Sequence, residues 1–137
     1  MNGSIRPLRI LIIEDNRSAA LSMRMFRLET GNTVEVAHTG PTGIETARQF
    51  GPEVVLCNIG LPGLDGYAVT RSLRQETGVR GAYLIAVTGY AQEPDQRLAK
   101  EAGFDMHLRK PIDFDDLQQI LAKLSLERPA GNNGIHV

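Results

Sequence analysis

The sequence alternates five short apolar runs with five longer amphipathic segments, and this order constrains the fold more than any other feature. The first run, Leu8 to Ile13 (LRILII), is apolar and β-branched, which is typical of a strand buried on both faces. The segment behind it places apolar residues such as Ala20 and Met23 at helical spacing. The alternation therefore predicts five βα units, with a parallel sheet covered by helices on both faces.

Capping and turn residues set the bounds of these elements. Side-chain oxygens that can cap a helix precede three of the helices, and they belong to Asn16 or Asp15, to Asp65 and to Asp113. Gly103 stands where a left-handed residue would close the fourth helix. The expected strands are 8–13, 33–37, 54–57, 82–87 and 104–108, and the expected helices are 17–29, 42–50, 67–76, 93–102 and 113–124.

One domain accounts for the chain. A length of 137 residues suits a single core and is short for two. The 42% apolar and 23% charged residues are close to the average of soluble globular proteins. Residues 8–126 carry the periodic pattern, whereas 1–7 and 127–137 lack it and are expected to be an N-terminal tail and a C-terminal tail or linker.

Charge and hydropathy exclude several classes of function. The formal net charge is −1, and no basic block indicates a nucleic-acid partner for this domain. The apolar runs are too short to span a membrane, and no signal peptide precedes them. The lone Cys57 rules out an internal disulfide, so we expect a cytoplasmic protein with Cys57 as a small core residue. His38 and His136 have no metal-ligand spacing and are expected on the surface.

Polar residues follow four of the expected strands, at the edge where a doubly wound sheet binds ligands. They are Glu14 and Asp15 after the first strand, Asn58 after the third, Thr88 after the fourth and Lys110 after the fifth. Each alone has an ordinary explanation, such as a helix cap, a turn or a solvated lysine. Their occurrence together at equivalent positions predicts a single functional crevice.

This set resembles the receiver domains (CheY-like) of bacterial two-component signalling. The family has an acidic pair, an acceptor about 43 residues further, a threonine about 30 residues after that, and then Lys-Pro, as here. The segments LPGLDG (61–66) and RKP (109–111) also resemble the family, and the likeness covers about residues 8–126. It implies an α/β fold of three layers with a doubly wound, five-stranded parallel sheet of order 2-1-3-4-5.

The resemblance also implies roles for the crevice residues. Glu14, Asp15, the side chain of Asn58 and the backbone carbonyl of Gly60 would hold Mg²⁺, which prefers oxygen ligands.

Thr88 and Lys110 would contact the phosphoryl group, and His107 stands at the position of the aromatic switch residue. Tyr90 and Gly60 stand where the family tunes the lifetime of the phosphoryl group.

Asn58 departs from the family, whose acceptor is an aspartate that forms an acyl phosphate. An asparagine amide carries no charge and its nitrogen lone pair is delocalised, so it cannot form that bond. We therefore expect a phosphorelay receiver domain that is not an enzyme, has no catalytic residue and binds Mg²⁺ more weakly than an Asn58→Asp version of the same chain. Two origins stay open, a natural pseudo-receiver and an engineered Asp-to-Asn change.

The resemblance implies a sensor histidine kinase or a histidine phosphotransfer protein as partner. It would dock through the first helix and the crevice loops. Output, and a possible homodimer, would use the face made by the fourth helix, the fifth strand and the fifth helix. Candidate residues on that face are Leu98, Lys100, Glu101, Asp105, His107 and Gln118 or Gln119.

Two alternatives belong to other classes of protein. A Mg²⁺-dependent phosphatase of the haloacid dehalogenase type would carry a second aspartate two residues after its nucleophile, where this chain has Gly60. A flavodoxin-like cofactor binder would carry a Ser/Thr-rich phosphate loop after the first strand, and this chain has none.

Overall fold

The computed structural model describes residues 7–79, 81–89 and 96–127, and for 26–30 and 96 it describes the backbone alone. Tyr90, His136, the expected start of the fourth helix at 93–95 and nearly all of both tails lie outside the described residues.

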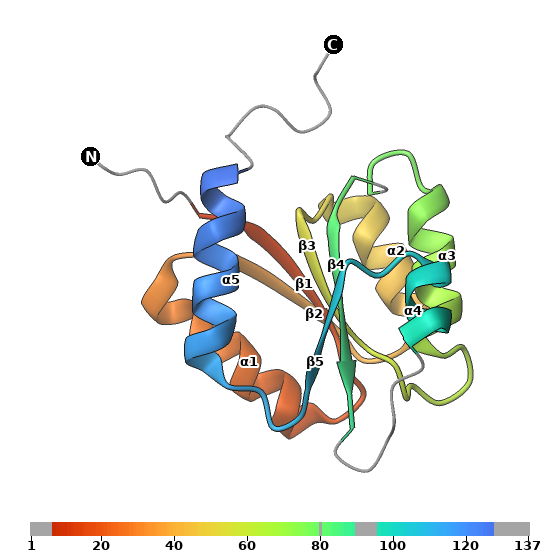
Figure 1. The fold of residues 1–137 in the computed structure, drawn as a ribbon, viewed down its shortest axis with the longest axis horizontal. Coiled ribbons are helices and arrows are strands. Elements are labelled where there is room, and N and C mark those ends of the chain that lie inside the picture. The colour runs from red at the N-terminus through yellow and green to blue at the C-terminus, as the bar shows by residue number, and fades with distance from the viewer. Residues whose placement is uncertain (1–6, 80, 90–95, 128–137) are drawn as a thin grey trace.

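Five parallel strands form one sheet in the order β2-β1-β3-β4-β5, which confirms the fold expected from the sequence. The strands are β1 (Arg9–Ile13), β2 (Thr33–Ala37), β3 (Val54–Asn58), β4 (Tyr83–Thr88) and β5 (Met106–Arg109). The helices are α1 (Arg17–Thr30), α2 (Gly40–Phe50), α3 (Gly66–Gln75), α4 (Gln96–Ala102) and α5 (Phe114–Glu127). In Figure 1 α1 and α5 cover one face of the sheet, and α2, α3 and α4 cover the other.

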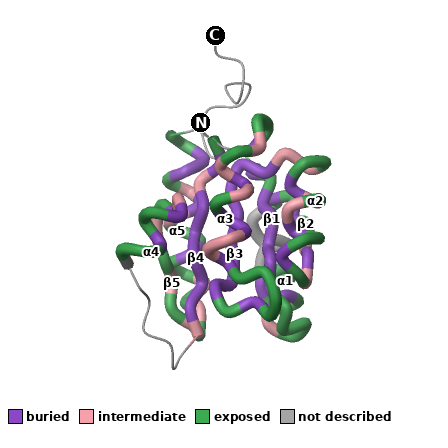
Figure 2. Tube along the Cα trace, turned by 90° about the vertical axis from the view of Figure 1, so that its right-hand side faces the viewer, coloured by how far each residue is buried: buried purple, intermediate pink, exposed green. Residues whose placement is uncertain are grey.

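The inner strands are buried along almost their whole length (Figure 2). Successive side chains of a strand point to opposite faces of the sheet, so each inner strand supplies both halves of the core. On β1, Leu11 packs in the cluster that contains α3 residues, whereas Ile12 packs in the cluster that contains α5 residues. This two-sided burial is the reason why residues 10–13 are apolar without interruption, whereas Arg9 at the start of β1 is exposed.

Side-chain caps fix the helices that begin at the crevice end of the sheet. The Asn16 Oδ1 accepts a hydrogen bond from the Ala19 amide at 2.9 Å, so Asn16 caps α1 and the Asp15 carboxylate remains at the crevice. Asp65 and Asp113 accept equivalent bonds for α3 and α5, as the sequence predicts.

Helix α2 begins at Gly40, two residues before the start expected from the sequence. Thr39 and Thr42 form a reciprocal capping box, and Pro41 is tolerated in the first turn because its missing amide would have no helical partner there.

Strand β5 begins at Met106, two residues later than expected. Phe104 instead packs in the core, with its ring edge-on to that of Tyr67 at 6.5 Å between centroids.

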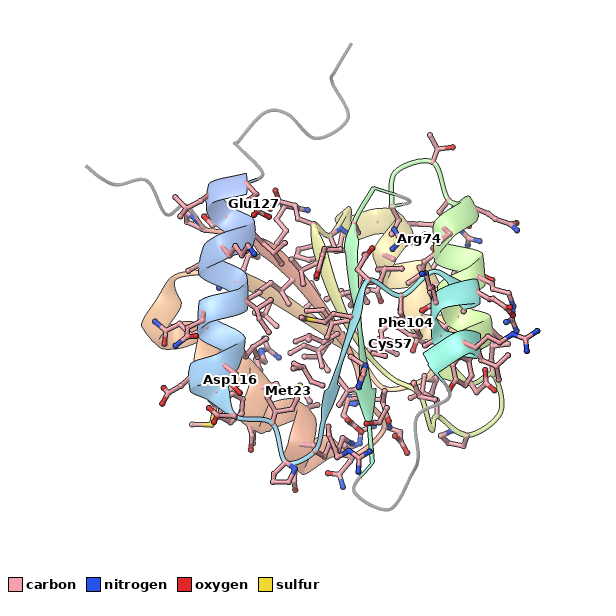
Figure 3. The ribbon with its side chains drawn as sticks, in the orientation of Figure 1. Met23, Cys57, Arg74, Phe104, Asp116 and Glu127 are labelled. Carbon is pink, nitrogen blue, oxygen red and sulfur yellow. The ribbon has the colours of Figure 1, made fainter. Side chains whose placement is uncertain are left out.

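Arg74 ties α3 to the segment that leads into β5 (Figure 3). Its guanidinium donates to the backbone carbonyl oxygens of Gly103 (2.9 Å from Nε) and Ala82 (2.8 Å from Nη1). It also pairs with the Asp105 carboxylate at 2.8 Å, and that carboxylate accepts from the Leu84 amide at 2.8 Å. Asp105, expected from the sequence on an outward binding face, therefore holds the sheet and α3 together.

No helix in the described part of the chain has the length and apolar character needed to cross a bilayer.

Replacing Gly66 by alanine is expected to destabilise the fold by about 1–3 kcal/mol, because a core packed this tightly resists an extra methyl group. A Cβ at Gly66 would lie 2.6 Å from the Ile59 Cα and 2.7 Å from the Asn58 carbonyl oxygen, and both are backbone atoms that cannot turn away. Chemical denaturation measures the loss. Gly78→Ala is the matched control, since a Cβ there meets nothing within 4 Å. Equal midpoints for the two variants would contradict the prediction.

Candidate functional site

An open cavity of about 370 Å³ lies at the carboxyl ends of the strands, where the sequence predicts it. Five of the seven expected site residues line it, namely Glu14, Asp15, Asn58, Gly60 and Lys110. Asn16 and Gly89 complete the wall. The parallel sheet explains this gathering, because β1 and β3 are neighbours and end at the same edge.

The amide of Asn58 is bonded on both sides. Its Nδ2 donates to the Asp15 Oδ1 at 2.9 Å and to the Glu14 Oε2 at 3.3 Å. Its Oδ1 accepts from the Gly60 backbone amide at 3.2 Å. Since carboxylates only accept hydrogen bonds, the nitrogen is the end of the amide that must face the acids. The Asn58 side chain is thus a neutral bridge between two carboxylates.

Glu14 is the buried centre of the site, with only 1% of its surface exposed. Its Oε1 lies 2.7 Å from the Lys110 ammonium nitrogen. Its Oε2 accepts from the Asn16 backbone amide at 3.0 Å, in addition to the bond from Asn58. Oε2 is therefore hydrogen-bonded twice, whereas Oε1 is not hydrogen-bonded and is compensated by the ion pair with Lys110.

The charges of this pocket nearly balance. Two carboxylates face one ammonium group and one neutral amide. A third carboxylate in place of the amide would add like-charge contacts, each worth about 4 kcal/mol at 4 Å for an effective dielectric constant of 20. The amide replaces this repulsion by two hydrogen bonds.

Thr88 and His107 are not brought into the crevice. The Thr88 side chain is fully buried, and its hydroxyl donates to the Leu108 carbonyl oxygen at 3.4 Å. His107 is exposed on β5 and alternates with Met106 and Leu108, whose side chains pack toward the core. Strand alternation therefore turns the His107 ring away from that core, and neither residue lines the cavity.

His38 is a residue that the sequence reasoning missed. It is half-buried, and its Nδ1 is 2.9 Å from the backbone carbonyl oxygen of Glu14, to which it donates. His38 is thus partly exposed, as a surface residue would be, but it also has a hydrogen bond to the crevice segment that the sequence does not indicate. The position of His38 directly after β2 could have indicated this contact. Ala37 at the end of β2 pairs in register with Ile13 of β1, so the residues that follow, His38 and Glu14, also lie side by side.

Cys57 is fully buried, as expected, and packs with the cluster on the α2–α4 side of the sheet. Burial raises the pKa of its thiol, and the nearby carboxylates of Glu14 and Asp65 raise it further. The thiol therefore stays protonated and has no part in the chemistry of the crevice.

The donor set of the crevice suits a hard cation such as Mg²⁺. The Asp15 carboxylate is exposed and all the polar lining atoms that could coordinate are oxygens. Glu14, however, is engaged by Lys110, and the Asn58 nitrogen rather than its oxygen faces the acids. Within the described residues, no three His, Cys, Asp or Glu side chains gather as metal ligands. The oxygen atoms of the crevice therefore fit Mg²⁺. Of the two crevice carboxylates, Glu14 is paired with Lys110, so Asp15 would be the anionic ligand.

A doubly wound sheet of this order, with two acids, an amide and a lysine at its carboxyl edge, defines a CheY-like signalling domain. The model of the response regulator receiver domain matches residues 10–122. The chain belongs to the response regulator receiver domain family. Members of this family act in two-component signalling and typically bind Mg²⁺, and the phosphatase alternative is not favoured.

Two curated relatives and one solved structure show the extent of the similarity. The chain is 35% identical to protein PilH of Pseudomonas aeruginosa over 109 residues, which cover 80% of this chain and 90% of PilH. It is 32% identical to the polar-differentiation response regulator DivK of Brucella anthropi, over 77% of this chain and 86% of DivK. The receiver domain of the sensor histidine kinase PA1611 from Pseudomonas aeruginosa, which holds magnesium in its active-site cleft, superposes with a TM-score of 0.78 at 28% identity, over 88% of this chain and 98% of that one.

Proposed function

We propose that this domain is a receiver that binds signalling partners without accepting a phosphoryl group. Asn58 takes the position of the phosphoacceptor at the end of β3, between the acidic pair and Lys110. The observation that carries the proposal is the pair of hydrogen bonds from the Asn58 Nδ2 to Asp15 and Glu14. They direct the amide nitrogen, which is not a nucleophile, to the place where an acceptor carboxylate would need to react.

The Asn58 side chain, which bridges Asp15 and Glu14, also satisfies the polar groups of the pocket without phosphate or metal. In a receiver with an aspartate acceptor, three carboxylates repel one another until a cation or a lysine offsets their charge. Here Lys110 offsets the charge of Glu14, and the Asn58 amide satisfies Asp15. The unphosphorylated form is consequently the stable form of this chain, which supports a role in binding rather than in phosphotransfer.

The proposed partner is a sensor histidine kinase or a histidine phosphotransfer protein. Docking would use α1 and the loops of the crevice, because α1 starts directly behind Asp15 and Asn16 and presents exposed apolar side chains. Output would pass through α4, β5 and α5. A cytoplasmic location is part of this proposal and rests on membership of the family.

Replacing Asn58 by aspartate is expected to lower the metal-free stability by about 2–3 kcal/mol, since two hydrogen bonds become two like-charge contacts. For a chain of this size the melting temperature falls by roughly 6–12 °C. Mg²⁺ is expected to raise the midpoint of the variant more than that of the parent, because a third carboxylate strengthens cation binding. Thermal melts of both proteins, with and without Mg²⁺, make the measurement.

Gln119→Glu on the exposed face of α5 is the control for added charge, and its midpoint should stay close to that of the parent in both conditions. Equal midpoints and equal Mg²⁺ shifts for the parent and Asn58→Asp would show that the amide bridge does not stabilise the pocket.

A further inference from the structure

The most exposed large apolar side chains lie on two helices that share one face of the sheet. Leu21 and Met25 on α1 are each 57% exposed, and Leu126 on α5 is 56% exposed. The other exposed large apolar side chains, Leu64 and Leu98, are 38% and 42% exposed. Large apolar side chains that are exposed on one face are typical of a protein-binding surface.

The two helices present these residues in the same outward direction. Both have 14 residues, and Met23 of α1 packs into the same core cluster as Leu117, Leu121 and Leu124 of α5. Leu21 and Met25 are one helical turn apart on the side of α1 opposite Met23, and Leu126 projects from the outer side of α5. Figures 1 and 3 show α1 and α5 as one layer over the sheet, which we call the α1–α5 face.

The two helices differ in the sign of their net charge. The sequence of α1 contains Arg17, Arg24 and Arg27 and a single acid, Glu29, and Arg17 and Arg24 are exposed. α5 has two exposed acids in its first turn, Asp115 and Asp116, and Glu127 at its end, against a single exposed base, Lys123. Among the described residues, none of Arg17, Arg24, Asp115 and Asp116 has an ion-pair partner. A basic helix thus lies in the same layer as an acidic one, and both carry exposed apolar side chains.

We propose that the α1–α5 face binds a second copy of this chain, with α1 of each copy lying on α5 of the other. A two-fold axis parallel to the helices gives this arrangement and makes the face self-complementary. It brings the first turn of α1, with Arg17, to the first turn of α5, with Asp115 and Asp116, because both helices begin at the crevice end of the sheet. A two-fold axis running across the helices would instead place α1 on α1, arginine against arginine.

A specific contact needs only part of the surface. A standard interface buries about 800 Å² on each partner, and the chain exposes 7553 Å². About a tenth of the surface therefore suffices. The dimer does not depend on the proposed docking of a kinase, but it covers the same α1 surface, so the two contacts exclude each other.

Three versions of the 137-residue chain test the arrangement by analytical ultracentrifugation. The parent is expected to form a dimer as its concentration rises. Arg17→Glu with Arg24→Glu makes both helices acidic, and Asp115→Lys with Asp116→Lys makes both helices basic. Each double variant alone is expected to dimerise at least tenfold more weakly, because like charges then face each other.

Mixing the two double variants provides the decisive measurement. An acidic α1 then meets a basic α5, and a basic α1 meets an acidic α5, so a heterodimer is expected to form. This recovery also shows that both variants are folded. The heterodimer should weaken at high salt, which screens exposed charges.

Two further variants test whether the dimer forms through the α1–α5 face or through another surface. Leu21→Ser with Met25→Ser is expected to give a monomer, whereas Lys100→Glu on α4 is expected to leave the dimer intact. A parent that stays monomeric at high micromolar concentration would overturn the proposal. So would dimer loss in Lys100→Glu, or a mixture of the charge variants that stays monomeric.

Discussion

The Asn58→Asp variant is expected to gain one phosphoryl group from acetyl phosphate in the presence of Mg²⁺, whereas the parent gains none. The reason is that the acidic pair and the lysine of the family pattern line the crevice, whereas the acceptor carboxylate is absent. Lys110 lies 2.7 Å from Glu14 at the wall of the crevice, and Asp15 lies 2.9 Å from the side chain of residue 58. A carboxylate at this position would face the acids that would hold a cation and the lysine that would offset the developing charge. Intact mass spectrometry makes the measurement.

A third protein, Asn58→Asp with Asp15→Asn, is the control. It has the acceptor but lacks the exposed acid best placed to bind Mg²⁺, so its labelling should be far slower. Labelling of Asn58→Asp alone would identify a competent receiver whose acceptor is blocked. No labelling of either variant that carries Asn58→Asp would mean that the crevice has lost more than its acceptor, as in a pseudo-receiver. A phosphoryl adduct on the parent would refute the proposed function.

Replacing Lys110 by methionine is expected to destabilise the fold by about 2–3 kcal/mol, because it leaves a buried carboxylate without its counter-charge. Glu14 is 1% exposed and cannot recover its hydration by a small movement. It keeps hydrogen bonds from Asn16 and Asn58, and Lys110 is itself 26% exposed, so the loss stays below that of a fully buried pair. Urea denaturation of the parent and the variant measures the change.

A double-mutant cycle assigns the loss to the ion pair. Glu14→Gln with Lys110→Met removes both charges, and the double variant should be more stable than Lys110→Met alone. Lys100→Met on the surface of α4 controls for the loss of a lysine and should change the midpoint little. A double variant less stable than Lys110→Met alone would show that Lys110 stabilises the fold through other contacts.

The five βα units and the gathering of Glu14, Asp15, Asn58 and Lys110 at one edge of the sheet follow from the sequence, whereas the order of the strands was implied by the resemblance to receiver domains. Apolar runs such as that before Glu14 can be buried only between two layers of helices, and polar residues at their ends must then meet at one edge. The helix caps Asp65 and Asp113 are local features, so three or four residues suffice to predict them. Element ends that depend on distant contacts, such as the start of β5 after Phe104, were predicted less well.

Contacts between residues far apart in the chain decided the rest. The bond from His38 to Glu14 spans 24 residues, and the pairing of Arg74 with Asp105 spans 31. No local sequence pattern predicts either pair, because the two residues of each pair come within hydrogen-bond distance only once the sheet has formed. The position of His107 likewise depends on which face of β5 turns toward the core.

The sequence by itself determined that this chain folds as a receiver domain and that residue 58 cannot carry an acyl phosphate, because both follow from residue type and order. Only the tertiary structure decided what Asn58 does instead. The fold brings residues 14, 15 and 58 within hydrogen-bond distance, and two carboxylates that can only accept then orient the amide nitrogen toward themselves.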